Sequence, residues 1–301
     1  MNRIYSYRNS IKSDRSDELI NTYLLRPIAG IIVWLLYYTP ITPNQVTIVS
    51  IMSGLVAAIF YLKGTASAFV AAGLFVTLKD VLDSADGQLA RAKQQQSRIG
   101  RFLDSIGDFV VNAAIFGSIG WILYNLNGDL LMLLLALLGF IGISLRVSYH
   151  VFYQVKFLHL RQQYKINRIS EEVRDEDLTK GGLELTLQYV FQFIYGWQDR
   201  LMVQIDRWSI GTVQNISESG QNRLSEDFFR NWYSDTTGLR ISGLLGFGTE
   251  LFLLTICSIF NKLELYLYLN LFVMNGVFIC CIAYRRFVLS SRIAAEKTSN
   301  I

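Results

Sequence analysis

The sequence predicts an all-α fold: an integral membrane bundle of six transmembrane helices, with an N-terminal surface helix and a cytoplasmic helical insert. Two properties of the chain favour this class. Apolar residues make up 51% of the 301 residues and charged residues only 17%, whereas an ordinary soluble domain is about 25% charged. Six stretches are also long and apolar enough to cross a bilayer, which takes about 20 residues in a helix.

The N-terminal region leads into these stretches. Residues 19–39 mix apolar side chains with Asn21, Arg26 and Pro27, and we expect them to form a helix along the membrane surface. A seventh span is the alternative. The six spans are expected at residues 44–62, 66–85, 102–126, 130–151, 241–260 and 265–283.

Basic residues are distributed unequally between the connections. The connections at 63–65, 127–129 and 261–264 carry only Lys63 and Lys262, and the other connections and the tails carry most of the remaining lysines and arginines. The positive-inside rule then places both termini in the cytoplasm. The chain divides into a cytoplasmic N-terminus with an amphipathic surface helix (1–43), four spans (44–155), a cytoplasmic amphipathic insert (156–240), and two spans with a cytoplasmic tail (241–301).

The charge balance and the cysteines exclude other classes. The chain has 28 basic and 24 acidic residues, and without a clustered basic face we expect no nucleic-acid partner. Cys257, Cys280 and Cys281 all lie in apolar runs, so we expect no disulfide framework. Membrane lipids are the expected surroundings.

The insert at 156–240 is too polar to span a membrane. Its apolar residues, among them Phe191, Ile194 and Trp208, recur near helical spacing. We therefore expect an amphipathic helix that packs on the protein or on the inner leaflet. A module that binds a partner protein is the alternative.

Four aspartates lie where the second span ends and the third begins. Asp83 and Asp86 are three residues apart, and Asp104 and Asp108 are four apart. Either spacing puts both carboxylates on one helix face. The polar segment 91–100 can turn the chain back, so two antiparallel helices can present four carboxylates to a common point.

Carboxylates in a membrane need compensation, because each costs about 2.5–3.5 kcal/mol at the centre of a spanning helix. Magnesium and manganese ions prefer oxygen ligands and can supply it. One alternative is a set of structural carboxylates paired with Lys79, Arg91 and Arg101. Another is a divalent-cation transporter, although the acidic residues gather at one face and only Glu250 lies deeper.

The same residues carry a resemblance to a known family. The pattern Asp83-x2-Asp86-Gly87-x2-Ala90-Arg91-x8-Gly100-x3-Asp104-x3-Asp108 resembles the signature of the CDP-alcohol phosphotransferases, also called CDP-alcohol phosphatidyltransferases. The segment Thr42-Pro43-Asn44-Gln45-Val46-Thr47 is similar to the family's entry into the first span. The insert departs from compact members, in which a short loop joins the fourth and fifth spans.

The resemblance implies an enzyme of phospholipid biosynthesis with its active site on the cytoplasmic side, working as a homodimer. Such an enzyme transfers a phosphatidyl or related group from a CDP-linked donor to an alcohol acceptor and releases CMP. We favour CDP-diacylglycerol as donor; a CDP-polar alcohol donor with a lipid acceptor is the alternative. The implied site comprises two divalent cations, Mg²⁺ or Mn²⁺, bound by Asp83, Asp86, Asp104 and Asp108, with Asp108 as catalytic base and Gly87, Ala90, Arg91 and Gly100 as CDP-binding residues.

Two charged residues outside the motif are candidates for the acceptor site. Glu250 falls midway along the fifth span, and Arg146 lies near the cytoplasmic end of the fourth. The alternatives are pairing with another helix for Glu250 and snorkelling for Arg146. Because the motif lies outside 156–240, we expect the insert to be accessory to metal and CDP binding.

Overall fold

The computed structural model describes residues 5–11, 18–161, 171–217 and 226–293, and parts of the expected insert and of both tails lie outside them. The described residues contain helices and no strand, so the predicted all-α class is confirmed. In chain order the elements are α1 Tyr7–Ser10, η2 Asn21–Leu25, α2 Arg26–Tyr37, α3 Pro43–Leu62, α4 Ala66–Lys93, α5 Arg98–Asn127, α6 Leu131–Leu160, α7 Asp175–Lys180, α8 Gly182–Ser217, α9 Glu226–Tyr233, α10 Thr236–Ser242, η3 Gly243–Leu245, α11 Phe247–Ile259, α12 Leu263–Tyr268, η4 Leu269–Met274, α13 Asn275–Ala283 and η5 Tyr284–Leu289.

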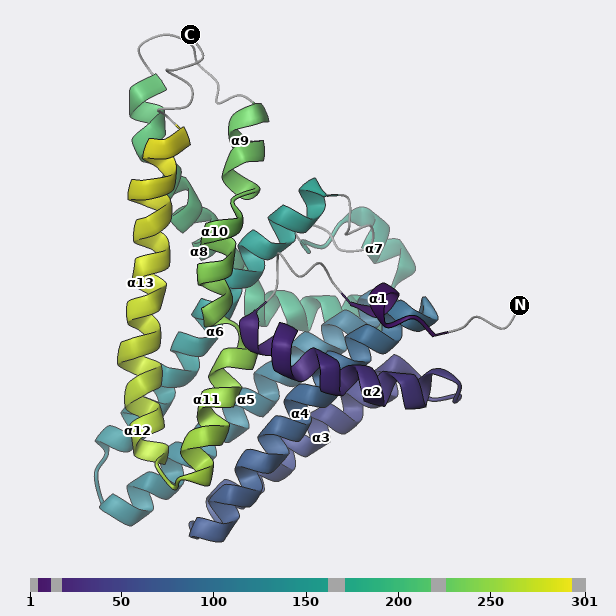
Figure 1. Ribbon diagram of the computed structural model, residues 1–301, viewed down its shortest axis with the longest axis vertical. Helices are drawn as coiled ribbons and strands as arrows, with labels where there is room; N and C mark the ends of the chain where they lie inside the picture. Colours follow the sequence, from purple (N-terminus) through teal and green to yellow (C-terminus); the bar gives the residue numbers. More distant parts are fainter. Residues whose placement is uncertain (1–4, 12–17, 162–170, 218–225, 294–301) are drawn as a thin grey trace.

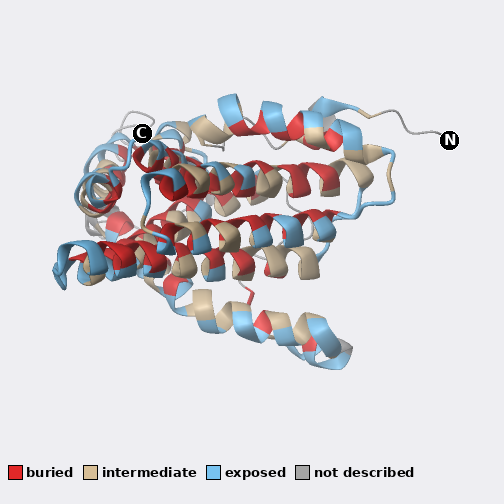
Figure 2. Cartoon of the chain, turned by 90° about the horizontal axis from the view of Figure 1, so that it is seen from below, coloured by how far each residue is buried: buried red, intermediate tan, exposed pale blue. Residues whose placement is uncertain are grey.

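The centre of the bundle consists of the long helices α3 to α6 together with α11 and α12 (Figure 1). Their facing sides share one apolar core, in which Ala57, Ile119 and Leu254 are fully buried. Glycines let the helices approach closely: a Cβ at Gly107 on α5 would lie 2.3 Å from Ile51 Cδ1 on α3. Figure 2 shows the buried residues along the inner sides of the helices and the exposed ones on the outer sides.

Five helical runs are long and apolar enough to cross a membrane: Pro43–Leu62, Arg98–Asn127, Leu131–Leu160, Phe228–Ile259 and Leu263–Ile293. The expected second span forms the 28-residue helix α4, which is not among them. Three charged residues, Lys79, Asp80 and Asp83, interrupt its apolar stretch within one turn. The structure thus supports a multi-pass membrane protein, and the count of six spans is not confirmed.

The N-terminal region forms a shorter apolar helix, Asn21–Tyr37, comprising η2 and α2. Ala29 and Val33 are fully buried on the side of α2 that packs on α4. Ile31 and Trp34 lie on another face and remain 61% and 55% exposed. This helix is shorter than the spanning runs and presents an apolar face outward.

The described part of the insert is helical, and its main element is the 36-residue helix α8. This helix packs on α5 and α6 and lies behind them in Figure 1. Its C-terminal half is held by Asp206, whose carboxylate accepts hydrogen bonds from Tyr153 Oη (2.9 Å), Trp232 Nε1 (2.9 Å) and Tyr233 Oη (2.6 Å). The insert is therefore packed on the bundle by buried polar contacts as well as by apolar ones.

Candidate active site

Two helix ends carry the aspartates of the motif. Helix α4 ends at Lys93, and the next residue, Gln94, caps it in a left-handed conformation (φ 57°). Helix α5 begins after Ser97, whose hydroxyl accepts a hydrogen bond from Gly100 N at 3.0 Å and so caps the first turn. The short turn between them brings the end of α4 next to the start of α5, as the polar segment predicted.

Three of the four aspartates meet. Carboxylate oxygens of Asp83 on α4 and of Asp104 and Asp108 on α5 all lie within 4.8 Å of one another. Asp86 lies outside this group, and its carboxylate accepts a hydrogen bond from the Thr47 hydroxyl on α3. The entry segment of the first span therefore contacts the motif directly through Thr47, for which the sequence alone indicated no partner.

A buried lysine neutralises part of this acidic cluster. Lys79, one turn before Asp83 on α4, has its Nζ 3.6 Å from Asp83 Oδ1 and donates a hydrogen bond to Asp108 Oδ1. The side chain of Lys79 is only 2% exposed. Of the three basic residues considered as structural partners of the aspartates, Lys79 does pair with them. Arg101 pairs instead with Glu171, and Arg91 Nε donates a hydrogen bond to Ser10 O at 2.5 Å. The i,i+4 spacing of Lys79 and Asp83 was the available sequence signal.

The donor set fits a divalent cation. Three carboxylates from two helices converge around one point, and such hard oxygen ligands are those preferred by Mg²⁺ and Mn²⁺. One lysine offsets only one of their three charges. The remaining negative charge, in a largely buried setting, favours a cation at this position.

The residues expected to bind CDP lie on the α4 side of the cluster and at the start of α5. A Cβ at Gly87 would lie 3.4 Å from Arg91 Nη1, so the Arg91 guanidinium lies over the bare backbone of Gly87. At Gly100 a Cβ would come within 2.7 Å of Asn44 Oδ1 at the start of α3. Ala90, half-buried, follows one turn after Gly87. A side chain at position 100 would therefore have to displace the Asn44 amide.

A cavity of about 850 Å³ adjoins Asp104 and Asp108 of the cluster. It lies between α5, α6 and the insert, and its lining includes Asp104 and Asp108 but none of the residues expected to bind CDP. Neutral polar groups lie beside aromatic and aliphatic ones in its wall, among them Asn112, Ser144, Ser148, Gln192, Phe109, Phe140 and Val147. The cavity wall and the residues expected to bind CDP therefore share no residue, although Arg101 of the wall directly follows Gly100.

The insert contributes to the wall of this cavity, and its being accessory to metal and CDP binding stays a prediction. Tyr195 on α8 lines the cavity, and its hydroxyl donates a hydrogen bond to Ser105 O at 2.7 Å, next to Asp104 on α5. Burial, and then the nearby Asp108 and Asp104 carboxylates, raise the pKa of Tyr195, so it remains a donor. No spacing in the sequence relates Tyr195 to the motif, because the contact joins residues 90 positions apart.

The two candidate acceptor residues pair with each other. Arg146 Nε donates to Glu250 Oε1 at 2.8 Å, and both side chains are fully buried. Asn270 Nδ2 donates to the other oxygen of Glu250 at 2.9 Å, and Arg146 Nη1 donates to Asn275 Oδ1 at 2.6 Å. Neither Arg146 nor Glu250 lines the cavity beside the aspartates. The geometry favours the pairing alternative, a polar link between α6, α11 and the last helical run.

These features together define a class: a helical, multi-pass membrane protein with a cluster of three carboxylates, suited to a cation, between two helix ends. Residues 40–171 match the family model of the CDP-alcohol phosphatidyltransferases. That part of the chain is a CDP-alcohol phosphatidyltransferase domain, and the resemblance seen in the motif is confirmed. The family comprises transferases of phosphate-containing groups.

Several curated relatives share part of the chain. A bifunctional IPC transferase and DIPP synthase of Thermococcus kodakarensis is 31% identical over 137 residues, covering 46% of this chain and 30% of that protein. An archaetidylinositol phosphate synthase of Pyrococcus horikoshii is 40% identical over 80 residues, 26% of this chain and 40% of that protein. A phosphatidylinositol phosphate synthase of Corynebacterium glutamicum is 30% identical over 98 residues, 33% of this chain and 42% of that protein. The aligned regions span less than half the length of each of these relatives.

Proposed function

We propose that the chain transfers a phosphatidyl or related phospho-group from a CDP-linked donor, CDP-diacylglycerol by preference, to an alcohol acceptor, with release of CMP. The observation that carries the proposal is the convergence within 4.8 Å of Asp83, which begins the family motif, with Asp104 and Asp108, which end it. The family match over residues 40–171 supports the reaction class. The alternative donor, a CDP-polar alcohol used with a lipid acceptor, is an outcome of the test below.

Two regions beside the cluster fit two substrates. On the α4 side, Arg91 over Gly87 offers a guanidinium, which suits a phosphate group, so we place the donor's pyrophosphate there with Ala90 and Gly100 nearby. The cavity that reaches Asp104 and Asp108 offers the acceptor a way to the same point. An alcohol held there faces the donor phosphorus across the carboxylates, and such alignment supplies much of the rate of a phosphoryl transfer.

The aspartates bind metal in this proposal. Asp83, Asp104 and Asp108 would hold one divalent cation. Asp86 would contribute a carboxylate oxygen to a second cation while it still accepts the hydrogen bond from Thr47. Divalent cations at this position supply charge neutralisation of the pyrophosphate and polarisation of the bond to be broken. Asp108, which lines the cavity, accepts the proton of the acceptor hydroxyl, and the Lys79 ammonium stabilises the carboxylates between turnovers.

We also propose the topology that the reaction needs. Helix α4 crosses the membrane as the sixth span, because it packs between α3 and α11, with its charged residues Lys79 and Asp80 buried within the bundle. Both termini and the motif then face the cytoplasm, and α2 lies along the membrane surface with Ile31 and Trp34 outward. The homodimer implied by the resemblance is checked by the mass of the purified protein–detergent particle.

The test uses the purified full-length chain with CDP-diacylglycerol, Mg²⁺ and a panel of polar alcohols, with products identified by mass. We expect CMP and a phosphatidyl-alcohol to appear together and only with the divalent cation. A parallel reaction with a CDP-polar alcohol and diacylglycerol distinguishes the alternative donor. The proposed function would be contradicted if neither reaction released CMP in a metal-dependent way.

A further inference from the structure

Two arginines lie at the start of α5, close to the carboxylate cluster. Arg101 comes one turn before Asp104 and lines the cavity that we assign to the acceptor, and Arg98 precedes it by three residues on the same helix. Arginines in such a place are suited to bind a phosphate group carried by the acceptor. Their actual partners therefore bear on which acceptor the cavity takes.

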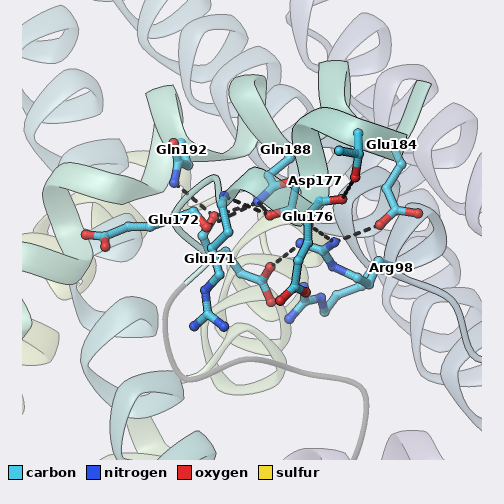
Figure 3. Close-up of polar contacts among 11 residues, drawn as sticks. Arg98, Glu171, Glu172, Glu176, Asp177, Glu184, Gln188 and Gln192 are labelled. Atoms are coloured by element: carbon cyan, nitrogen blue, oxygen red, sulfur yellow. Dashed lines mark hydrogen bonds and ion pairs between the residues drawn. The ribbon is translucent and has the colours of Figure 1, made fainter. Parts of the chain in front are cut away.

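Carboxylates of the insert bind both arginines, and Figure 3 shows those around Arg98. Glu171 bridges them: its Oε2 lies 2.8 Å from Arg98 Nη2, and its Oε1 contacts Arg101 Nη2. Asp177 and Glu184 bind the other terminal nitrogen of Arg98 at 2.9 and 2.7 Å. Two guanidinium charges thus face three carboxylates, and the arginine charge is fully compensated.

The Glu171 side chain is held firmly in this position. It is only 7% exposed, and its backbone carbonyl accepts hydrogen bonds from Gln188 Nε2 (3.0 Å) and Gln192 Nε2 (2.9 Å) of α8. Figure 3 shows both glutamines reaching from α8 to the Glu171 segment. Displacing Glu171 would leave a buried carboxylate without its partners, which is costly.

We propose, on the basis of the function proposed above, that Glu171 takes the place of an acceptor phosphate, so that the cavity selects an unphosphorylated polyol. A phosphate near the reacting hydroxyl would find Arg101 already paired and Glu171 repelling it. The neutral groups of the wall, Asn112, Ser144, Ser148, Gln192 and Tyr195, suit a molecule rich in hydroxyl groups. Lys156, near the end of α6, and Arg200 and Arg207 of α8 also line the cavity, where the carboxylates of Glu172 and Asp199 lie in the same wall.

The test compares matched acceptors on the purified full-length chain: myo-inositol with inositol phosphate, and glycerol with glycerol 3-phosphate. Calorimetry measures the affinity of each compound, and CMP release from CDP-diacylglycerol with Mg²⁺ measures its use. We expect each neutral polyol to be preferred over its phosphate ester. Glu171→Gln frees Arg101, and should raise the affinity for the phosphate esters about tenfold or more, as charge-assisted hydrogen bonds allow.

Glu184→Gln is the matched control. It removes one negative charge from the same network but leaves Arg101 paired with Glu171, so acceptor preference should remain that of the wild type. A wild-type preference for the phosphate esters, or equal effects of the two variants, would overturn the inference while leaving metal-dependent CMP release intact. Absence of CMP release with every acceptor would instead contradict the proposed function. The wild-type affinities for the neutral polyols and for their phosphate esters would still test the inference, even if Glu171→Gln did not fold.

Discussion

Lys79 and Asp108 form a buried ion pair inside the acidic cluster. The lysine comes from α4 and the aspartate from α5, and Lys79 Nζ also lies 3.6 Å from Asp83 Oδ1. A single ammonium therefore joins two of the three carboxylates that are placed to bind a cation. This arrangement keeps the cluster stable without metal and leaves charge for metal to neutralise.

Replacing Lys79 by methionine should make the fold depend on metal. Breaking a buried ion pair costs about 3–5 kcal/mol, so we expect Lys79→Met to melt well below the wild type in the presence of chelator. Added Mg²⁺ should recover more stability in the variant than in the wild type. Lys262→Met, at an exposed position between α11 and α12, is the control. Equal Mg²⁺-induced shifts in Lys79→Met and wild type would contradict the idea that Lys79 stands in for part of the cation's charge, and no shift in either protein would show that the cluster binds no Mg²⁺.

Glu250 should matter for stability and not for acceptor binding. Glu250→Gln leaves Arg146 buried beside a neutral side chain, at a cost of about 3–5 kcal/mol. We expect a lower melting temperature in detergent but unchanged CMP release per folded molecule at permissive temperature. Glu264→Gln, exposed at the start of α12, should change neither. If Glu250→Gln melted at the wild-type temperature but lost affinity for the acceptor, Glu250 would have to be assigned to the acceptor site.

Asp199 of α8 should give the insert a pH response. Desolvation in the cavity wall, and next the Glu171 carboxylate, raise the pKa of Asp199 from 3.8 to about 6. The folded state then binds this proton more tightly than the unfolded state, so the contribution to stability is full below the unfolded pKa and is lost as pH rises through the folded one. We expect Asp199→Asn to flatten the fall in melting temperature between pH 4 and 6. Parallel curves for variant and wild type would contradict the raised pKa.

Labelling of single cysteines tests the topology. In a variant without the native cysteines, a cysteine at Gly128, in the turn between α5 and α6, should react with an impermeant thiol reagent on intact cells. A cysteine at Glu176 of α7 should react only after permeabilisation. The reverse pattern would place the motif on the face opposite to the one we propose.

Local spacing predicted the acidic site well. The i,i+3 and i,i+4 pairs of aspartates and the polar turn between them already imply two helices with carboxylates facing one another, and three of the four do meet. Helix periodicity is a property of nearby residues, which explains this success. The same spacing did not separate Asp86 from the rest, because its partner, Thr47, comes from a third helix.

Helix periodicity could not predict the contacts that the insert makes with α5. Arg98 and Glu171, or Ser105 and Tyr195, are brought together by the packing of α8 on α5, and no period in the sequence relates them. The sequence shows an acidic run at 171–177, but nothing in its spacing indicates that Arg98 and Arg101 are its partners. Likewise, charges on α4 that were counted in a span are buried by neighbouring helices, which composition alone does not show.

The most direct test of the account is CMP release by the aspartate variants. With CDP-diacylglycerol, a polyol and Mg²⁺, the wild-type chain should form CMP, whereas Asp83→Asn, Asp86→Asn and Asp104→Asn should form none while melting as folded proteins, since each keeps its shape and loses a charge that binds metal. Glu264→Gln should match the wild type. Substantial metal-dependent CMP release by any of the three asparagine variants would contradict the assignment of these carboxylates as the catalytic metal site.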